Sequence, residues 1–213
     1  RLSENDRAKL SKLENAPSIL KLVESWLERL PFTNMKDFKF WDEYQKSVDS
    51  ILKDDEEIIL KNSAALSESQ KNIQLENLSL TKSTFKSLFD KSAHEELISS
   101  KQRRLSQKAI LNALFILLYR DESMLALPFQ VLTAMMDIDE NFTTWRYRHS
   151  LLAQRMLGTK IGTGGSSGHQ YLKRAADNNR VFVDLFNLST FLIPRSRLPI
   201  LPDDIKKQLN FYV

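Results

Sequence analysis

The sequence predicts an all-α protein, and three observations support this class. Glycine and proline are scarce, with 5 Gly and 6 Pro among 213 residues, so the residues that most often end helices are few. Hydrophobic residues make up 42% of the chain, enough to bury a substantial core. They recur at three- and four-residue spacings, which is typical of helices with one apolar face. We therefore expect a helical bundle that forms a single domain over residues 1–213.

The expected helices follow one another along the chain, and local signals mark several of their ends. Ser18 and Ser106 are suited to N-caps, Pro31 stops a helix, Pro128 suits the first turn of one, and Gly158 follows the last turn of the same helix. The expected helices cover residues 19–30, 41–61, 90–100, 106–120, 128–157, 181–193 and 203–211, with the end of another helix in 1–13 and the start of one in 170–176.

One part of the chain looks peripheral. Residues 62–81 are rich in Ser, Asn, Lys and Glu and show little periodicity, which permits a solvated helix or a helical hairpin. An aromatic cluster of Phe38, Phe40, Trp41 and Tyr44 leads into the helix expected over residues 41–61, which precedes this segment. We expect residues 33–95 to form a peripheral helical excursion from the main bundle.

Composition also excludes several classes of functional site. The chain has no cysteine, so zinc–thiolate sites, cysteine nucleophiles and thiolate-ligated haem are excluded, and a reducing compartment such as the cytoplasm is expected. The net charge is +4, and basic and acidic residues are interspersed. No long basic block indicates nucleic-acid binding, because the longest cluster is only 101–104. We see no signal peptide and no apolar run that could cross a membrane.

His149 is the first candidate for chemistry. In a helix it shares an apolar stripe with Trp145, Phe142, Leu152 and Met156. From this spacing alone a half-desolvated core histidine is the commoner outcome. The alternative is a ligand to a metal or a haem iron, with Trp145 as an apolar wall for a flat macrocycle. The spacing leaves both interpretations open.

A glycine-rich loop follows this helix. Residues 162–168 hold four glycines and three hydroxyl side chains, but the pattern is neither a P-loop nor a dinucleotide fingerprint. A flexible connector is one interpretation. The other is a binding loop whose backbone N–H groups suit a carboxylate and whose Thr163 hydroxyl suits the ammonium group of a zwitterion.

The remaining polar candidates carry less weight. His94 lies in a polar context and is expected at the surface, and a role for His169 at the loop exit is not implied. Asp137 and Asp139 do not face each other on a helix. We expect them to serve as caps or to pair with the arginines of 146–148.

Several ordered segments together resemble the tryptophan 2,3-dioxygenase family. The resemblance covers most of the chain and is strongest over residues 103–195. The segments that carry it are Trp26-Leu27-Glu28-Arg29, Arg103-Arg104-Leu105-Ser106, Phe129-Gln130-Val131-Leu132-Thr133, Met136-Asp137-Ile138-Asp139, Trp145-Arg146-Tyr147-Arg148-His149, Arg155-Met156-Leu157-Gly158, residues 162–168 and residues 183–195.

The resemblance implies a helical, tetrameric, cytoplasmic haem b enzyme of the kynurenine pathway. Such an enzyme opens the indole C2–C3 bond of L-tryptophan with O2 and yields N-formylkynurenine. His149 matches the family's proximal haem ligand, with Trp145 beside the cofactor. Thr163 matches the threonine that contacts the substrate ammonium group, and Arg1 matches the arginine that binds the substrate carboxylate.

The sequence also departs from the family pattern. The family's upstream third, which carries the distal-pocket histidine and part of the indole site, has no counterpart here. Ala8 stands where the family usually has glycine, the segment that follows it is shorter, and His169 replaces a usual tyrosine. We therefore expect these 213 residues alone to turn over weakly or not at all. The alternative is a haem- or tryptophan-binding fragment or paralogue that acts as a subunit.

Overall fold

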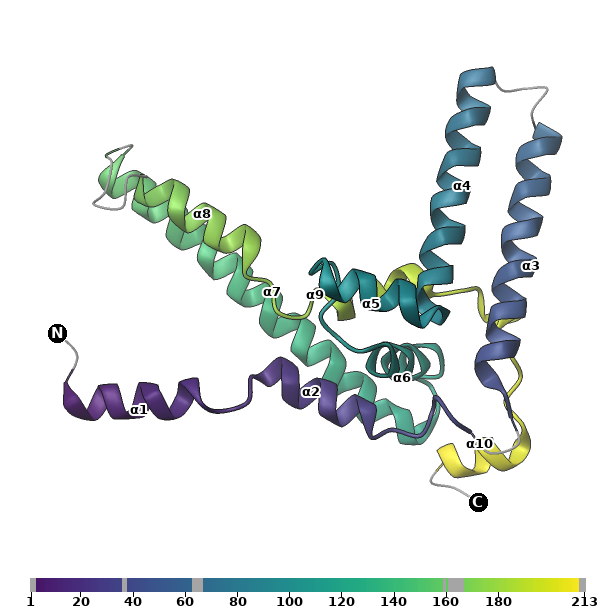
Figure 1. Cartoon of the computed structure of the whole chain (residues 1–213), viewed down its shortest axis with the longest axis horizontal. Coiled ribbons are helices and arrows are strands. Elements are labelled where there is room, and N and C mark those ends of the chain that lie inside the picture. The colour runs from purple at the N-terminus through teal and green to yellow at the C-terminus, as the bar shows by residue number, and fades with distance from the viewer. Residues whose placement is uncertain (1–2, 36–37, 63–66, 159, 161–166, 211–213) are drawn as a thin grey trace.

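A computed structural model describes residues 3–35, 38–62, 67–158, 160 and 167–210 of the chain, and within them it contains helices and no strands (Figure 1). The all-α class is thus confirmed. The α-helices are α1 Glu4–Glu14, α2 Ile19–Glu28, α3 Phe40–Lys61, α4 Glu68–Phe89, α5 Lys91–Ser99, α6 Gln107–Leu118, α7 Ser123–Leu157, α8 Gly168–Asn178, α9 Val183–Asn187 and α10 Asp203–Leu209, and two short 3-10 helices are η2 Leu188–Phe191 and η3 Arg195–Arg197.

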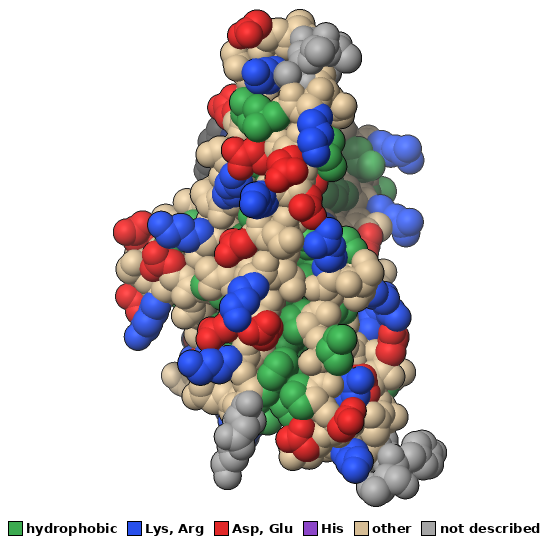
Figure 2. Space-filling model, turned by 90° about the vertical axis from the view of Figure 1, so that its right-hand side faces the viewer, with side chains coloured by type: hydrophobic (Ala, Val, Ile, Leu, Met, Phe, Trp, Pro, Cys, Tyr) green, Lys and Arg blue, Asp and Glu red, His purple; other side chains and the backbone are tan. Residues whose placement is uncertain are grey.

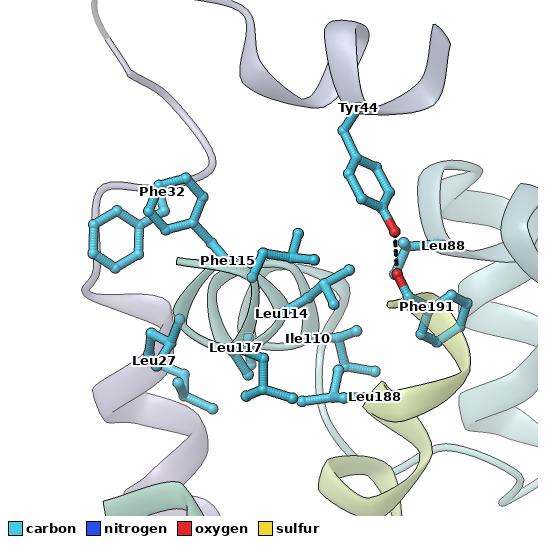
Figure 3. Close-up of a cluster of buried hydrophobic side chains, with 14 of the residues drawn as sticks. Leu27, Phe32, Tyr44, Leu88, Ile110, Leu114, Phe115, Leu117, Leu188 and Phe191 are labelled. Carbon is cyan, nitrogen blue, oxygen red and sulfur yellow. Dashed lines mark hydrogen bonds between the residues drawn. The ribbon is translucent and has the colours of Figure 1, made fainter. Parts of the chain in front are cut away.

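Helix α6 lies at the centre of the core because its sequence is apolar on nearly every side. Its side chains from Ala109 to Leu118 are buried, apart from the half-buried Leu111. Figure 3 shows Leu27 of α2 and Phe32 on one side of this helix and Leu88, Leu188 and Phe191 on the other. Each fully buried leucine or phenylalanine contributes on the order of 1.5–3 kcal/mol of transfer free energy.

Helices α2 and α6 supply hydrogen-bond partners for the polar groups at each other's ends. The N-cap Ser106 of α6 donates its backbone N–H to Glu24 Oε1 at 2.9 Å and its hydroxyl to Glu28 Oε1 at 2.6 Å. In return, Asn112 Nδ2 donates to the carbonyl oxygens of Leu27 and Leu30, at 2.8 and 3.2 Å, where α2 ends. Acidic side chains suit the positive N-terminal end of a helix, so these contacts fix the two helices beyond their apolar packing.

The expected peripheral region contains a hairpin of α3 and α4, which projects from the body (Figure 1). Its base belongs to the core, since Phe40, Tyr44 and Leu88 are buried. The Tyr44 hydroxyl donates to the backbone carbonyl of Phe191 (Figure 3). On the face that carries this hairpin, acidic and basic side chains are interspersed (Figure 2). None of the described helices combines the length and the hydrophobicity that crossing a membrane requires.

Two expected boundaries were wrong. Helix α7 begins at Ser123, so Pro128 lies inside it, where the ring cannot donate the usual hydrogen bond to the carbonyl four residues earlier. The expected helix over 181–193 is instead α9 followed by the 3-10 helix η2. The chain enters α9 through hydrogen bonds to a buried aspartate of α7, described below, and this tertiary contact overrides the apolar pattern. The N-caps at Ser18 and Ser106 are confirmed.

Candidate functional site

The candidate site lies on an arm formed by the second half of α7 and by α8. These helices lie side by side and project from the body (Figure 1). Ser150 is buried on the α7 side of their contact, and its hydroxyl lies 2.9 Å from Nδ1 of His169 on α8. Further along, Tyr147 donates to the Asp177 carboxylate, and Arg146 donates to the Asn179 carbonyl at 2.9 Å. Polar contacts therefore hold the two helices together along the arm.

A buried carboxylate fixes the arm to the body. Asp139 is only 3% exposed, and its oxygens accept the backbone N–H groups of Val181 and Phe182, each at 3.0 Å. Of the two roles expected of Asp139, a cap or a partner of an arginine, the arginine pair was therefore wrong. Asp139 instead accepts hydrogen bonds from these two backbone N–H groups just before α9. Within the described residues they have no carbonyl partner in a helix, because α9 begins only after them. Asp137, two residues earlier, faces solvent.

The opposite side of α7 carries His149 on an exposed apolar stripe. The Trp145 ring is stacked with the His149 ring, with 5.6 Å between centroids and 6° between planes. Phe142 is 55% exposed, Trp145 60% and Met156 75%. His149 is itself exposed and makes no hydrogen bond within the described part of the chain, so it is not a core histidine. An apolar surface of this extent is typical of a site that covers a ligand or a partner.

The arrangement fits a flat apolar group with a coordinating metal. A single imidazole would suffice to hold an iron whose other ligands come from a macrocycle. The indole ring one turn earlier, parallel to the imidazole, adds apolar surface beside it. The backbone behind the stripe is held by Ser150 and Asp139, so the imidazole is carried on a fixed helix.

Other candidates fall outside the described residues. Arg1, Thr163 and the loop residues 161–166 are not described, so the substrate contacts expected of Arg1 and Thr163 stay predictions. The ends of the loop are defined. Gly158 ends α7 with a φ of +60°, a conformation that favours glycine, and Ser167 begins α8 by accepting the backbone N–H of Gln170 at 3.3 Å.

His94 was wrongly expected at the surface. It is 1% exposed, with Nε2 3.0 Å from the Leu105 carbonyl oxygen and Nδ1 2.8 Å from a terminal nitrogen of Arg103. Since Arg103 can only donate, Nδ1 is the acceptor and Nε2 carries the proton. The sequence did contain a signal: His94 precedes Leu97 and Ile98 by three and four residues, which places it on their side of α5.

The fold and the stripe define a class: helical proteins that present an exposed histidine beside an aromatic ring on one face of a long helix. The model of the family described as tryptophan 2,3-dioxygenase matches residues 1–192. Proteins named "Tryptophan 2,3-dioxygenase" from Alteromonas mediterranea, Bdellovibrio bacteriovorus and Dictyostelium discoideum are 47%, 46% and 42% identical over 213, 211 and 210 residues, or 100%, 99% and 98% of this chain. The chain belongs to the tryptophan 2,3-dioxygenase family.

These alignments cover only part of the relatives. The chain spans 59%, 58% and 52% of the lengths of the three proteins. Membership of the family is therefore shown for this chain, whereas the activity of the whole protein is a separate question.

Proposed function

We propose that this chain supplies the haem-binding side of an enzyme that oxidises L-tryptophan with O2 to N-formylkynurenine. One observation carries the proposal: His149 is exposed and stacked with the Trp145 ring, on a helix whose other face is fixed. Membership of the tryptophan 2,3-dioxygenase family agrees with it. When bound, haem b supplies the iron chemistry by which O2 is activated.

The protein's own groups have separate tasks in this proposal. His149 would hold the haem iron through one ring nitrogen. Trp145 and Phe142 would pack against the bound haem and exclude water from it. Thr163 accepts a hydrogen bond from the substrate ammonium group, and Arg1 binds the substrate carboxylate through two parallel hydrogen bonds. These last two contacts hold the amino-acid end of tryptophan, and the indole ring is left for the reaction.

Assembly belongs to the same proposal. Helix α1 buries none of its side chains within the described chain, and Leu13 and Leu22 are 69% and 54% exposed. Together with the stripe on α7, these surfaces fit contacts with further protein, and we propose a cytoplasmic homotetramer. Size-exclusion chromatography with light scattering tests the assembly, and a monomer of the intact protein would contradict it.

The haem assignment is tested by titrating haem into the intact protein and into two variants. His149→Ala removes the proposed ligand, whereas His169→Gln removes a second imidazole that is already hydrogen-bonded to Ser150. We expect the Soret band of wild-type protein and of His169→Gln, and loss of that band in His149→Ala with partial rescue by added imidazole. A Soret band of unchanged position and affinity in His149→Ala would exclude the assignment.

A second candidate is a non-catalytic subunit that binds haem or tryptophan and associates with complete subunits. The observation that favours it is the exposed apolar surface of α1 and of the α7 stripe within the described chain, which fits contact with another subunit. Turnover by residues 1–213 alone, measured as N-formylkynurenine formed per haem, separates the two. We expect these residues to retain haem and to form product at least about 100-fold more slowly than a full-length relative, because a 1 Å loss of positioning can cost that much. Comparable turnover would show that the remainder is not required.

A further inference from the structure

A pocket lies away from the arm, in the body of the protein. It has a volume of about 360 Å3, and residues of α4, α5, α6, α9 and η2 and of the link after α5 line it, while none comes from α7 or α8. Its apolar lining includes Ile110, Leu188 and Phe191. Its polar lining includes one cation, Arg103, and one anion, Asp184. The pocket therefore combines an apolar surface with one charge of each sign.

The Arg103 guanidinium is partly used by the fold. One terminal nitrogen donates to the Ser87 carbonyl at 3.1 Å and to His94 Nδ1 at 2.8 Å, and the other donates to the Ser87 hydroxyl at 2.9 Å. A guanidinium has five N–H donors. The Nε–H and one N–H of the second terminal nitrogen have no partner within the described part of the chain, and no carboxylate there lies within 4.0 Å of Arg103.

The Asp184 carboxylate is also partly used. It is 5% exposed, and Oδ2 accepts the backbone N–H groups of Arg104 and Leu105, each at 2.7 Å. Its Oδ1 has no hydrogen-bond partner in the described part of the chain. Oδ1 is not among the fully enclosed unpartnered oxygens of the described residues, so it stays within reach of a donor that a ligand in the pocket supplies.

We propose that this pocket binds a free α-amino acid with an aliphatic side chain. The ligand carboxylate accepts from the unused N–H groups of Arg103, and its ammonium group donates to Asp184 Oδ1. Its side chain packs on Ile110 and Leu188. A simple anion is repelled by Asp184 and a simple amine by Arg103, so the two charges together select a zwitterion. The site needs neither haem nor His149.

The ligand test uses the intact protein and isothermal titration calorimetry. L-Leucine is compared with 4-methylpentanoate, which lacks only the ammonium group, and with 3-methylbutylamine, which lacks only the carboxylate. We expect leucine to bind with one site per chain and each analogue to bind at least about tenfold more weakly, because each lacks one of the two charged groups that would pair with Arg103 and Asp184. Equal binding of the three compounds, or no binding of leucine, would overturn the proposal.

The location is tested with two tryptophan substitutions on the exposed side of α4. Ser83 lines the pocket, whereas Thr81 does not, and both hydroxyls bond to carbonyls of their own helix. We expect Ser83→Trp to abolish leucine binding and Thr81→Trp to preserve it, with both variants unfolding at the wild-type temperature. His149→Ala should bind leucine as the wild type does, whether or not it binds haem. Loss of binding in His149→Ala, or its retention in Ser83→Trp, would contradict a separate site.

Discussion

Helix α6 and the second half of α7 both carry large apolar side chains, yet they use them in opposite ways. In α6 nearly every side chain is buried, including Leu114 and Ile116, which are fully enclosed. In α7 the polar side chains Asp139, Thr143 and Ser150 are buried, while Phe142 and Trp145 are exposed. The core thus gains its stability from apolar burial, and the arm is held by buried polar contacts.

The difference explains how the arm can offer an apolar surface. A helix that packs on the body only through its apolar face has buried that face, so it cannot offer it to a ligand. Because Asp139 and Ser150 attach α7 from its polar side, the stripe around His149 is free for a cofactor or a partner. The arm therefore gives up folding stability that a buried stripe would provide, and keeps an apolar surface for binding.

The largest expected effect comes from removing a core leucine. Leu114→Ala leaves a cavity in α6, and we expect the free energy of unfolding to fall by about 2–5 kcal/mol. Leu152→Ala makes the same chemical change on the arm, where the side chain is 53% exposed, and we expect a change within about 0.5 kcal/mol. Urea unfolding of the haem-free protein measures both. Equal losses would show that the stripe is covered in solution.

The next effect concerns the buried carboxylate. Asp139→Ala removes the acceptor for the backbone N–H groups of Val181 and Phe182, and we expect a loss of about 2–3 kcal/mol, because donors left buried without a partner are costly. Asp137→Ala, on the exposed side, is the matched control. Hydrogen exchange should accelerate at Val181 and Phe182 in Asp139→Ala alone. Unchanged exchange there would mean that the arm is attached by other contacts.

The comparison also shows what the sequence could reveal. The position and burial of α6 follow from its unbroken apolar run and from the Ser106 N-cap, both of which are local. The identity of the haem-ligand candidate followed from the ordered segments around His149. Its exposure did not, because periodicity shows that a helix has an apolar face and not whether anything covers that face.

Contacts between distant residues were beyond prediction. Asp184 binds the N–H of Arg104 across 80 positions of sequence, and Asp139 binds that of Val181 across 42. The local sequence around neither aspartate identifies the backbone groups that it binds. The error at His94 is of another kind: its side of α5 could be inferred from Leu97 and Ile98, whereas its partners Arg103 and Leu105, outside its own helix, could not.

The smallest expected effect is a pH dependence that starts from His94. Burial lowers the pKa of His94 below its usual 6.5, and the charge of Arg103 lowers it further, against the opposing effects of the Leu105 carbonyl and Asp184. The folded state thus prefers the neutral ring. Its contribution to stability is present above about pH 6.5, the pKa in the unfolded chain, and is lost as the pH falls through the lower folded value.

The variant His94→Gln isolates this contribution. A glutamine amide can still donate to the Leu105 carbonyl but does not titrate. We expect wild-type protein to lose more unfolding free energy between pH 7 and pH 5 than His94→Gln does, whereas His169→Gln should follow the wild type. Unfolding by urea at several pH values measures the slopes. Parallel slopes for wild type and His94→Gln would mean that a protonated His94 is tolerated beside Arg103. The core around α5 would then accommodate an added charge as well as the solvent-exposed arm does.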